Sequence, residues 1–318
     1  MKKINSQRHK VPAQNNDLKQ SVLKNKFSFF PIKEIIANEI KSVANIQRSG
    51  KCITGIPTGF GRVDDLTSGL QSGNLIVVAA RPIMGKTAFA LAIARNAALD
   101  AGVPVALFSM EFSKEMLGKR LLFTETKMDF RKMFIEPLTD TDCNNIGKAS
   151  NRLSDAPLFI NDATRISVQE IKSEIGKIQP DKNIGLIIID YLQLMRSDKL
   201  YDTRDQEVSE ICRSLKDLAK ELNLPVVVLS QISRKPEFRD DHRPCLRDLS
   251  GSGSIAAEAD VVLFIYRDYV YNRTEDNPES GLADIIVAKH RNGQTGLVKL
   301  SFNEKYSRFE NLITIHEE

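Results

Sequence analysis

The sequence lacks long apolar runs, paired cysteines and clustered histidines, and each absence removes a class of protein. No stretch of the 318 residues approaches the roughly 20 apolar residues of a membrane span, and no basic start precedes a short apolar block, as in a secretory leader. The four cysteines form no CxxC pair, and the four histidines have no metal-ligand spacing with them. We therefore expect a cytoplasmic protein with no membrane segment, disulfide or structural metal.

Charge is unevenly distributed along the chain. The net charge is +4, but residues 1–51 hold 11 Lys and Arg against 3 Asp and Glu, which leaves 34 basic and 38 acidic residues beyond them. Residues 1–30 are rich in Lys, Asn, Gln and Ser, and we expect a disordered basic leader there. Such a leader is either a solvated tail or a contact for nucleic acid or an acidic surface, so composition alone does not establish nucleic-acid binding.

Residues 31–50 have the pattern of an amphipathic helix. Ile32, Ile35, Ile36 and Ile40 recur at helical spacing, and Pro31 suits a first helical position. The apolar stripe of this helix would cover either its own domain or a groove on a neighbouring subunit.

Residues 51–318 alternate between apolar strands and helical segments and form the expected main domain. This alternation predicts an α/β fold with a mostly parallel central sheet, helices on both faces and antiparallel edge strands. Helices are expected at 85–96, 167–178 and 205–222. Strands are expected at 75–80, 104–109, 157–161, 184–190 and 224–231, with three antiparallel ones at 260–266, 283–290 and 296–302.

The stretch VVAARPIMGKTAFA, residues 77–90, fits the phosphate-loop pattern [AG]xxxxGK[ST] between a strand and a helix start. Backbone N–H groups would hold the phosphates, Lys86 would reach the β and γ oxygens, and Thr87 would give a hydroxyl to Mg²⁺. Ala80 replaces the usual first glycine, which a negative φ would permit. The expected nucleotide contacts are Ala80, Arg81, Pro82, Met84, Gly85, Lys86, Thr87 and Ala88.

Polar residues follow three of the predicted strands. Asp190 closes the strand 184–190, where a carboxylate would hold magnesium, and Glu111 follows the strand 104–109, where it would align the attacking water. Gln231 ends the strand 224–231, and its amide would sense the γ-phosphate. The alternatives are a helix-start acid for Glu111 and an ordinary polar strand end for Gln231.

Six segments stand in a fixed order: TGFGRVDDLTSGL, AARPIMGKTAF, FSMEFS, IIIDYLQLM, VVVLSQISR and VAKHRNGQTG. Together they closely resemble the C-terminal ATPase domain of bacterial replicative DNA helicases of the DnaB type, over about residues 30–311. The resemblance implies a RecA-like P-loop ATPase. It also implies a homo-hexameric ring on single-stranded DNA, with ATP and Mg²⁺ bound between subunits and 5′-to-3′ unwinding.

The resemblance assigns roles to individual residues. It implies that Glu111 is the catalytic base, that Asp190 holds Mg²⁺ through water, and that Gln231 is the γ-phosphate sensor. Lys289 and Arg291 match a pair of cations that reach the ATP of the adjacent subunit. Two cations two apart on a strand point to the same side, so both can meet one triphosphate; the alternative is a pair of solvated charges at a strand edge.

The resemblance has two departures. The helix 31–50 resembles the family's linker helix, but the residues before it do not resemble the N-terminal helical domain. The resemblance therefore does not extend to primase binding, while a helicase loader is a candidate partner. In the loop 248–260 the family reads DLRESGxIEQDAD, whereas here Ser250 and Gly251 replace the charged pair.

Small residues in this loop leave backbone N–H groups open to a phosphate. We expect Ser250, Gly251 and Gly253 to contact DNA in this way, with Arg247 as a cation; the alternative is a flexible surface turn. The sequence thus predicts a replicative helicase motor. The alternative function is a RecA-like ATPase switch or assembly module of a plasmid, phage or defence system, with weak or no unwinding.

Overall fold

The computed structural model describes residues 29–37, 40, 53–129, 135–249, 252–274 and 276–312. Residues 1–51 and 52–318 form two separate units. In the first unit, residues 32–37 and residue 40 are helical, inside the predicted helix 31–50, while most of the predicted leader lies outside the described residues. None of the helices in the described ranges is long and apolar enough to cross a bilayer.

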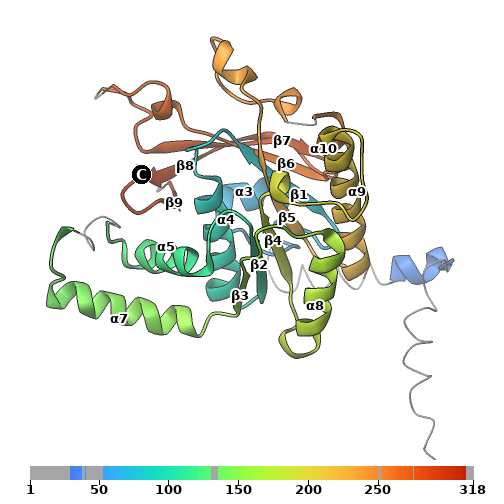
Figure 1. The fold of residues 1–318 in the computed structure, drawn as a ribbon, viewed down its shortest axis with the longest axis horizontal. Coiled ribbons are helices and arrows are strands. Elements are labelled where there is room, and N and C mark those ends of the chain that lie inside the picture. The colour runs from blue at the N-terminus through green and yellow to red at the C-terminus, as the bar shows by residue number, and fades with distance from the viewer. Residues whose placement is uncertain are drawn as a thin grey trace, which may run out of the picture. The chain divides into compact units, whose positions relative to one another are not determined.

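The second unit is built on one nine-stranded sheet in the order β3-β2-β4-β5-β1-β6-β7-β8-β9 (Figure 1). The strands are β1 Leu75–Ala80, β2 Val105–Ser109, β3 Leu158–Asn161, β4 Leu186–Asp190, β5 Val226–Gln231, β6 Val261–Tyr266, β7 Leu282–His290, β8 Gly296–Asn303 and β9 Arg308–Asn311. Neighbours from β3 to β6 pair in parallel, and neighbours from β6 to β9 pair antiparallel. The predicted mixed sheet is confirmed, and β9 was not predicted.

Helices cover both faces of the sheet, because β1 alternates its apolar residues between two cores. Ile76 and Val78 pack in one core with α4 and α5, while Leu75 and Val77 pack in the other with α8, α9 and α10 (Figure 1). The helices are α3 Gly61–Thr67, α4 Lys86–Arg95, α5 Lys114–Thr126, α7 Asp140–Ser154, α8 Val168–Lys182, α9 Arg204–Leu222 and α10 Ser252–Glu258.

Three helical features differ from the sequence prediction. The glycine-rich segment before β1 contains α3, where the Asp64 carboxylate accepts hydrogen bonds from the N–H and hydroxyl of Thr58. The segment predicted as a DNA loop or surface turn contains α10, because Ile255 is fully buried against the sheet. Helix α8 ends at Lys182, four residues beyond its predicted end at 178.

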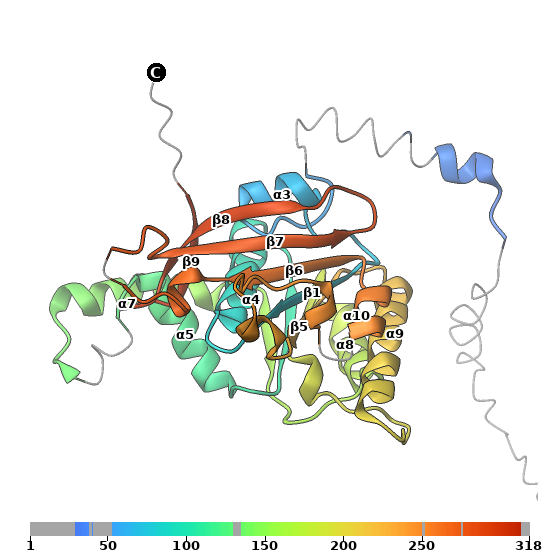
Figure 2. The same cartoon turned by 90° about the horizontal axis from the view of Figure 1, so that it is seen from above.

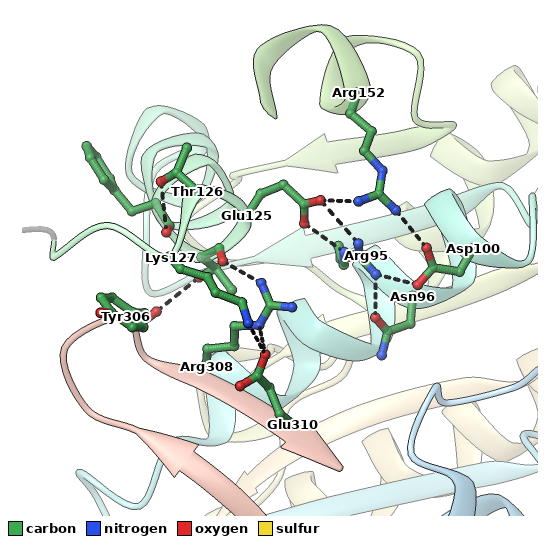
Figure 3. Close-up of polar contacts among 12 residues, drawn as sticks. Arg95, Asn96, Asp100, Glu125, Thr126, Lys127, Arg152, Tyr306, Arg308 and Glu310 are labelled. Atoms are coloured by element: carbon green, nitrogen blue, oxygen red, sulfur yellow. Dashed lines mark hydrogen bonds and ion pairs between the residues drawn. The ribbon is translucent and has the colours of Figure 1, made fainter. Parts of the chain in front are cut away.

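An ionic network ties α7 to α4 and α5 (Figure 3). The Glu125 carboxylate on α5 accepts from Arg95 Nε at 2.9 Å and from Arg152 on α7. The same two arginines also pair with Asp100, just after α4. Glu125 is the hub of this network, since its side chain is only 8% exposed and it bonds both arginines.

Glu125→Gln is expected to lower the free energy of unfolding by about 2 kcal/mol near neutral pH, because two arginines then face a neutral amide. Burial alone raises the pKa of Glu125, but the hydrogen bond and charge of Arg95 and the charge of Arg152 outweigh it, so the folded pKa lies below 4.5. The contribution of the carboxylate is complete above its unfolded pKa and is lost as the pH falls through the folded pKa.

Urea unfolding near neutral pH and in acid measures this effect. The difference between Glu125→Gln and the wild type should be large near neutral pH and should shrink in acid. Glu174→Gln, which removes a carboxylate that is 41% exposed, serves as the control and should change stability little. An equal loss in both variants would contradict the role of Glu125 as the hub.

Candidate nucleotide-binding site

The carboxyl ends of β1, β2, β4 and β5 meet at one edge of the sheet because these strands are parallel. This edge borders a cavity of about 490 Å³. Lys86, Thr87, Glu111 and Gln231 all line the cavity, and Asp190 is hydrogen-bonded to Thr87 beside it. The structure therefore brings together residues that the sequence separates by up to 145 positions.

The phosphate loop joins the end of β1 to the start of α4. Ala80 is the last residue of β1 and has the extended conformation of a strand, so its methyl group is accommodated as expected. Gly85 has φ 100°, and a Cβ built on it would lie 3.1 Å from the ring of Phe309, so glycine is required there. No side chain caps the start of α4, which leaves its first N–H groups to an anion.

Ile83, between these two positions, has a positive φ of 73°, which is strained for a β-branched residue. The buried Arg267 supports this turn by donating from Nη1 to the Ile83 carbonyl at 3.2 Å. Arg267 also pairs with Glu304 and lies over the Phe302 ring, 4.1 Å from its centroid. The loop is thus held in shape from β6 and β8 without help from a ligand.

Lys86 projects into the cavity and donates from Nζ to the Ala80 carbonyl at 3.3 Å. Burial lowers the pKa of Lys86, while the charges of Asp190 and Glu111 act in the opposite direction. A phosphate group offers this ammonium a stronger acceptor than a single carbonyl.

The Thr87 hydroxyl donates to Asp190 Oδ2 at 2.8 Å. Asp190 Oδ1 is buried and has no hydrogen-bond partner among the described residues. Burial raises the pKa of Asp190 to about 6, although the Thr87 hydrogen bond lowers it. An oxygen pair with one unused lone-pair site fits Mg²⁺, which prefers oxygen ligands and keeps several of its waters.

Glu111 and Gln231 stand on either side of this pair. The N–H of Met110 donates to the Asp190 carbonyl at 2.8 Å, which fixes the chain just before Glu111. Gln193 was not predicted, and it clamps Gln231: its Oε1 accepts from the Gln231 N–H at 3.0 Å, and its Nε2 donates to the Gln231 carbonyl. The backbone at Gln231 is therefore anchored to the segment after β4.

Three arginines that line the cavity were also missed in the sequence: Arg120, Arg267 and Arg273. Arg120 lies over the Phe112 ring, 4.0 Å from its centroid, beside Glu111. With Lys86 these arginines give the cavity the positive charge that a triphosphate needs. The signal for Arg267 was its place directly after an apolar strand, as with Asp190; Arg120 lies inside a helix with no comparable signal.

The other predicted nucleotide contacts divide into two groups. Pro82, Gly85 and Ala88 line the cavity, whereas the side chain of Met84 is buried in the core. Arg81 turns away toward the segment after β5, where it pairs with Glu237 at 2.6 Å and donates to the Ile232 carbonyl at 3.0 Å. Any contact of Arg81 with a nucleotide would therefore be made by its backbone.

The predicted DNA loop begins from a firm base. Asp248 is fully buried and accepts from Arg239 Nη2 at 2.7 Å and from the Cys245 N–H at 2.8 Å. Arg247 is exposed beside it, and Gly253 is exposed in the first turn of α10. Ser250 and Gly251 lie outside the described residues.

Lys289 and Arg291 lie at the opposite end of the sheet from the phosphate loop. Their neighbours are the first residues of β6 and β1, whereas the phosphate loop follows the last residue of β1. The six residues of β1 span about 17 Å at 3.3 Å per residue. The two cations do share one side, as predicted, but they are remote from the cavity of their own subunit.

Comparisons with known proteins agree with this geometry. The family model of the DnaB-like helicase C terminal domain matches residues 55–311. The chain is 42% identical over 287 residues to the replicative DNA helicase DnaB of Leifsonia xyli subsp. xyli, which covers 90% of this chain and 62% of that protein. It is 42% identical over 290 residues to the replicative DNA helicase DnaC of Bacillus subtilis, which covers 91% and 63%.

Two solved structures are also similar. One is an isolated ATPase domain with a TM-score of 0.83 and 35% identity, and the match covers 90% of this chain and all of that one. A DnaB-like replicative helicase, described with its primase interactions, has a TM-score of 0.80 and 34% identity, covering 93% of this chain and 70% of that one. The chain spans less than two thirds of the length of the two curated relatives. With its RecA-like fold, it belongs to the family of DnaB-like helicase C-terminal domains.

Proposed function

We propose that this chain is the motor of a replicative DNA helicase, which hydrolyses ATP with Mg²⁺ to move along single-stranded DNA and unwind duplex. The observation that carries the proposal is the division of one ATPase site between two ends of the fold. The cavity holds the phosphate loop, the acids and Gln231, while Lys289 and Arg291 lie a full strand length away. Such a division is useful only when subunits are arranged in a ring or a row.

Within one subunit, the loop and α4 bind the phosphates, and Lys86 neutralises the β and γ oxygens. Thr87 and Asp190 would hold Mg²⁺, which supplies charge neutralisation between the β- and γ-phosphates. Glu111 aligns the attacking water and accepts its proton. Gln231 contacts the γ-phosphate, and its loss on hydrolysis relaxes the segment 232–249 that leads to the DNA contacts.

A second subunit completes the site with Lys289 and Arg291, which stabilise the charge that develops on the transferred phosphoryl group. The hexameric ring and the 5′-to-3′ direction follow from family membership, and the cytoplasm is the compartment in which such a motor meets its DNA. The strand would be held by Arg247 and by the backbone of Ser250, Gly251 and Gly253.

The test is ATP hydrolysis with and without single-stranded DNA, at low salt and near physiological salt. We expect DNA to raise the turnover at least about fivefold, because the binding of DNA and the hydrolysis of ATP are coupled through the segment 232–249. The stimulation should survive the higher salt if the backbone N–H groups contact phosphates, since these groups depend less on counterion release than lysines do. A strand-displacement assay under the same conditions measures unwinding.

Turnover that is indifferent to DNA at both salts would contradict the proposal. It would favour a RecA-like ATPase switch or assembly module instead. The replacement of the family's charged pair by Ser250 and Gly251 is the feature that makes this outcome informative.

A further inference from the structure

The two remote cations are not free on the surface of their own subunit. Lys289 Nζ donates to the carbonyls of Ala256 at 2.6 Å, Ala257 at 3.2 Å and Ala259 at 2.7 Å, at the C-terminal end of α10. Arg291 donates to the Ala257 carbonyl as well. The last carbonyls of a helix have no partner within the helix, so these side chains occupy the acceptors left open there.

A buried carboxylate completes this cradle. Asp260 is 5% exposed, and its Oδ1 accepts from Arg291 Nη1 at 3.3 Å. Its Oδ2 accepts from Lys216 Nζ on α9 at 2.5 Å and from the Leu75 N–H at 2.8 Å. Asp260 is therefore shared between a structural cation from α9 and a cation that is needed elsewhere. Lys216 has a second acceptor in the Gly73 carbonyl, at 2.8 Å.

Helix α10 joins this cradle to the DNA contacts. It has only seven residues, begins beside Arg247 and contains Gly253 in its first turn. It packs on α9 next to the sheet (Figure 2). A short helix moves as one body, so a phosphate that shifts its first turn also shifts the carbonyls of Ala256, Ala257 and Ala259.

We propose that Asp260 and the last carbonyls of α10 hold Lys289 and Arg291 in a resting position, from which DNA contact at the other end of α10 releases them. Asp260 is then a positioning residue for the cations that act on the neighbouring subunit's triphosphate. The inference rests on the proposed function and deepens it. It explains how DNA on one subunit controls hydrolysis on the next.

Two variants change the grip on Arg291 in opposite directions. Lys216→Met removes the competing cation, so Asp260 holds Arg291 more tightly and DNA-free hydrolysis should fall. Lys216→Met combined with Asp260→Asn removes the carboxylate charge and keeps an acceptor for the Leu75 N–H, so DNA-free hydrolysis should rise. We expect about a fivefold change in each direction, with similar turnover when DNA saturates. A purely structural role would lower both rates.

Acylation of lysines in the wild-type ring, without nucleotide, needs no variant. A mild acylating reagent, followed by site-resolved mass spectrometry, should modify Lys289 slowly and should modify it faster when single-stranded DNA is added. Lys177, whose side chain is 64% exposed, gives the reference rate. Lys289 reactivity that DNA leaves unchanged or lowers would overturn the release.

Arg291→Ala separates the two levels of the proposal. If this variant hydrolyses ATP at the wild-type rate, the shared site fails and the cradle fails with it. If it loses hydrolysis, but both Lys216 variants have wild-type DNA-free rates, the shared site stands and the cradle is overturned.

Discussion

Lys86→Ala is expected to reduce ATP hydrolysis at least about 100-fold, the loss that follows the removal of one strong donor from a transition-state site. Lys86 is the cavity's lysine, and burial already lowers its pKa, so the ammonium is poised to gain from phosphate contact. The fold should remain intact, because its Nζ bonds a single carbonyl, at 3.3 Å. Phosphate release under saturating ATP measures the effect.

Lys148→Ala on α7 removes an exposed lysine far from the cavity and should leave both turnover and thermal stability unchanged. A Lys86→Ala ring that still turned over at the wild-type rate would remove the phosphate-loop assignment. Because the proposed chemistry depends on that loop, it would also redirect attention to the remaining cations of the cavity.

Arg291→Ala should lower hydrolysis by about 10³-fold while ATP binding stays nearly unchanged, as expected for a cation supplied in trans. Binding is preserved because the loop, Lys86 and Thr87 belong to the other subunit. A fluorescent ATP analogue measures the affinity and phosphate release measures the turnover, so the two effects separate in one preparation.

Mixing Arg291→Ala chains with Glu111→Gln chains tests the trans arrangement directly. Neither variant is active alone, but a mixed ring contains interfaces where an intact Glu111 meets an intact Arg291. We expect partial recovery of turnover that grows with the fraction of such interfaces. Mass spectrometry of the mixed rings confirms that subunits exchange, and exchange without recovery would place both groups in one subunit.

The central part of the fold was predictable because its signals are local. The strand 75–80, the phosphate loop and the helix after it are consecutive in the chain, and each has its own pattern of apolar residues or glycines. Asp190, Glu111 and Gln231 were also found, since carboxyl ends of parallel strands must share one edge. That rule converts a one-dimensional pattern into a site without knowledge of the packing.

The parts that were missed depend on long-range contacts. Arg267 is defined by its hydrogen bond to Ile83, 184 residues earlier, and Gln193 by its bonds to Gln231 across two strands. The seven residues of α10 are rich in glycine and serine, so their helix is stabilised by the burial of Ile255 rather than by propensity. The sequence placed Lys289 and Arg291 on one side but contained no sign of their partners around α10.

The contact between Phe309 and Gly85 has a consequence for the order in which the chain becomes functional during synthesis. The ring that closes the space beneath the phosphate loop belongs to β9, which pairs with β8 at the edge of the sheet. Most of the chain has therefore left the ribosome before this support exists. Although β1 and α4 are made early, we expect the nascent chain to acquire nucleotide binding only near the end of translation, after the parallel core has formed.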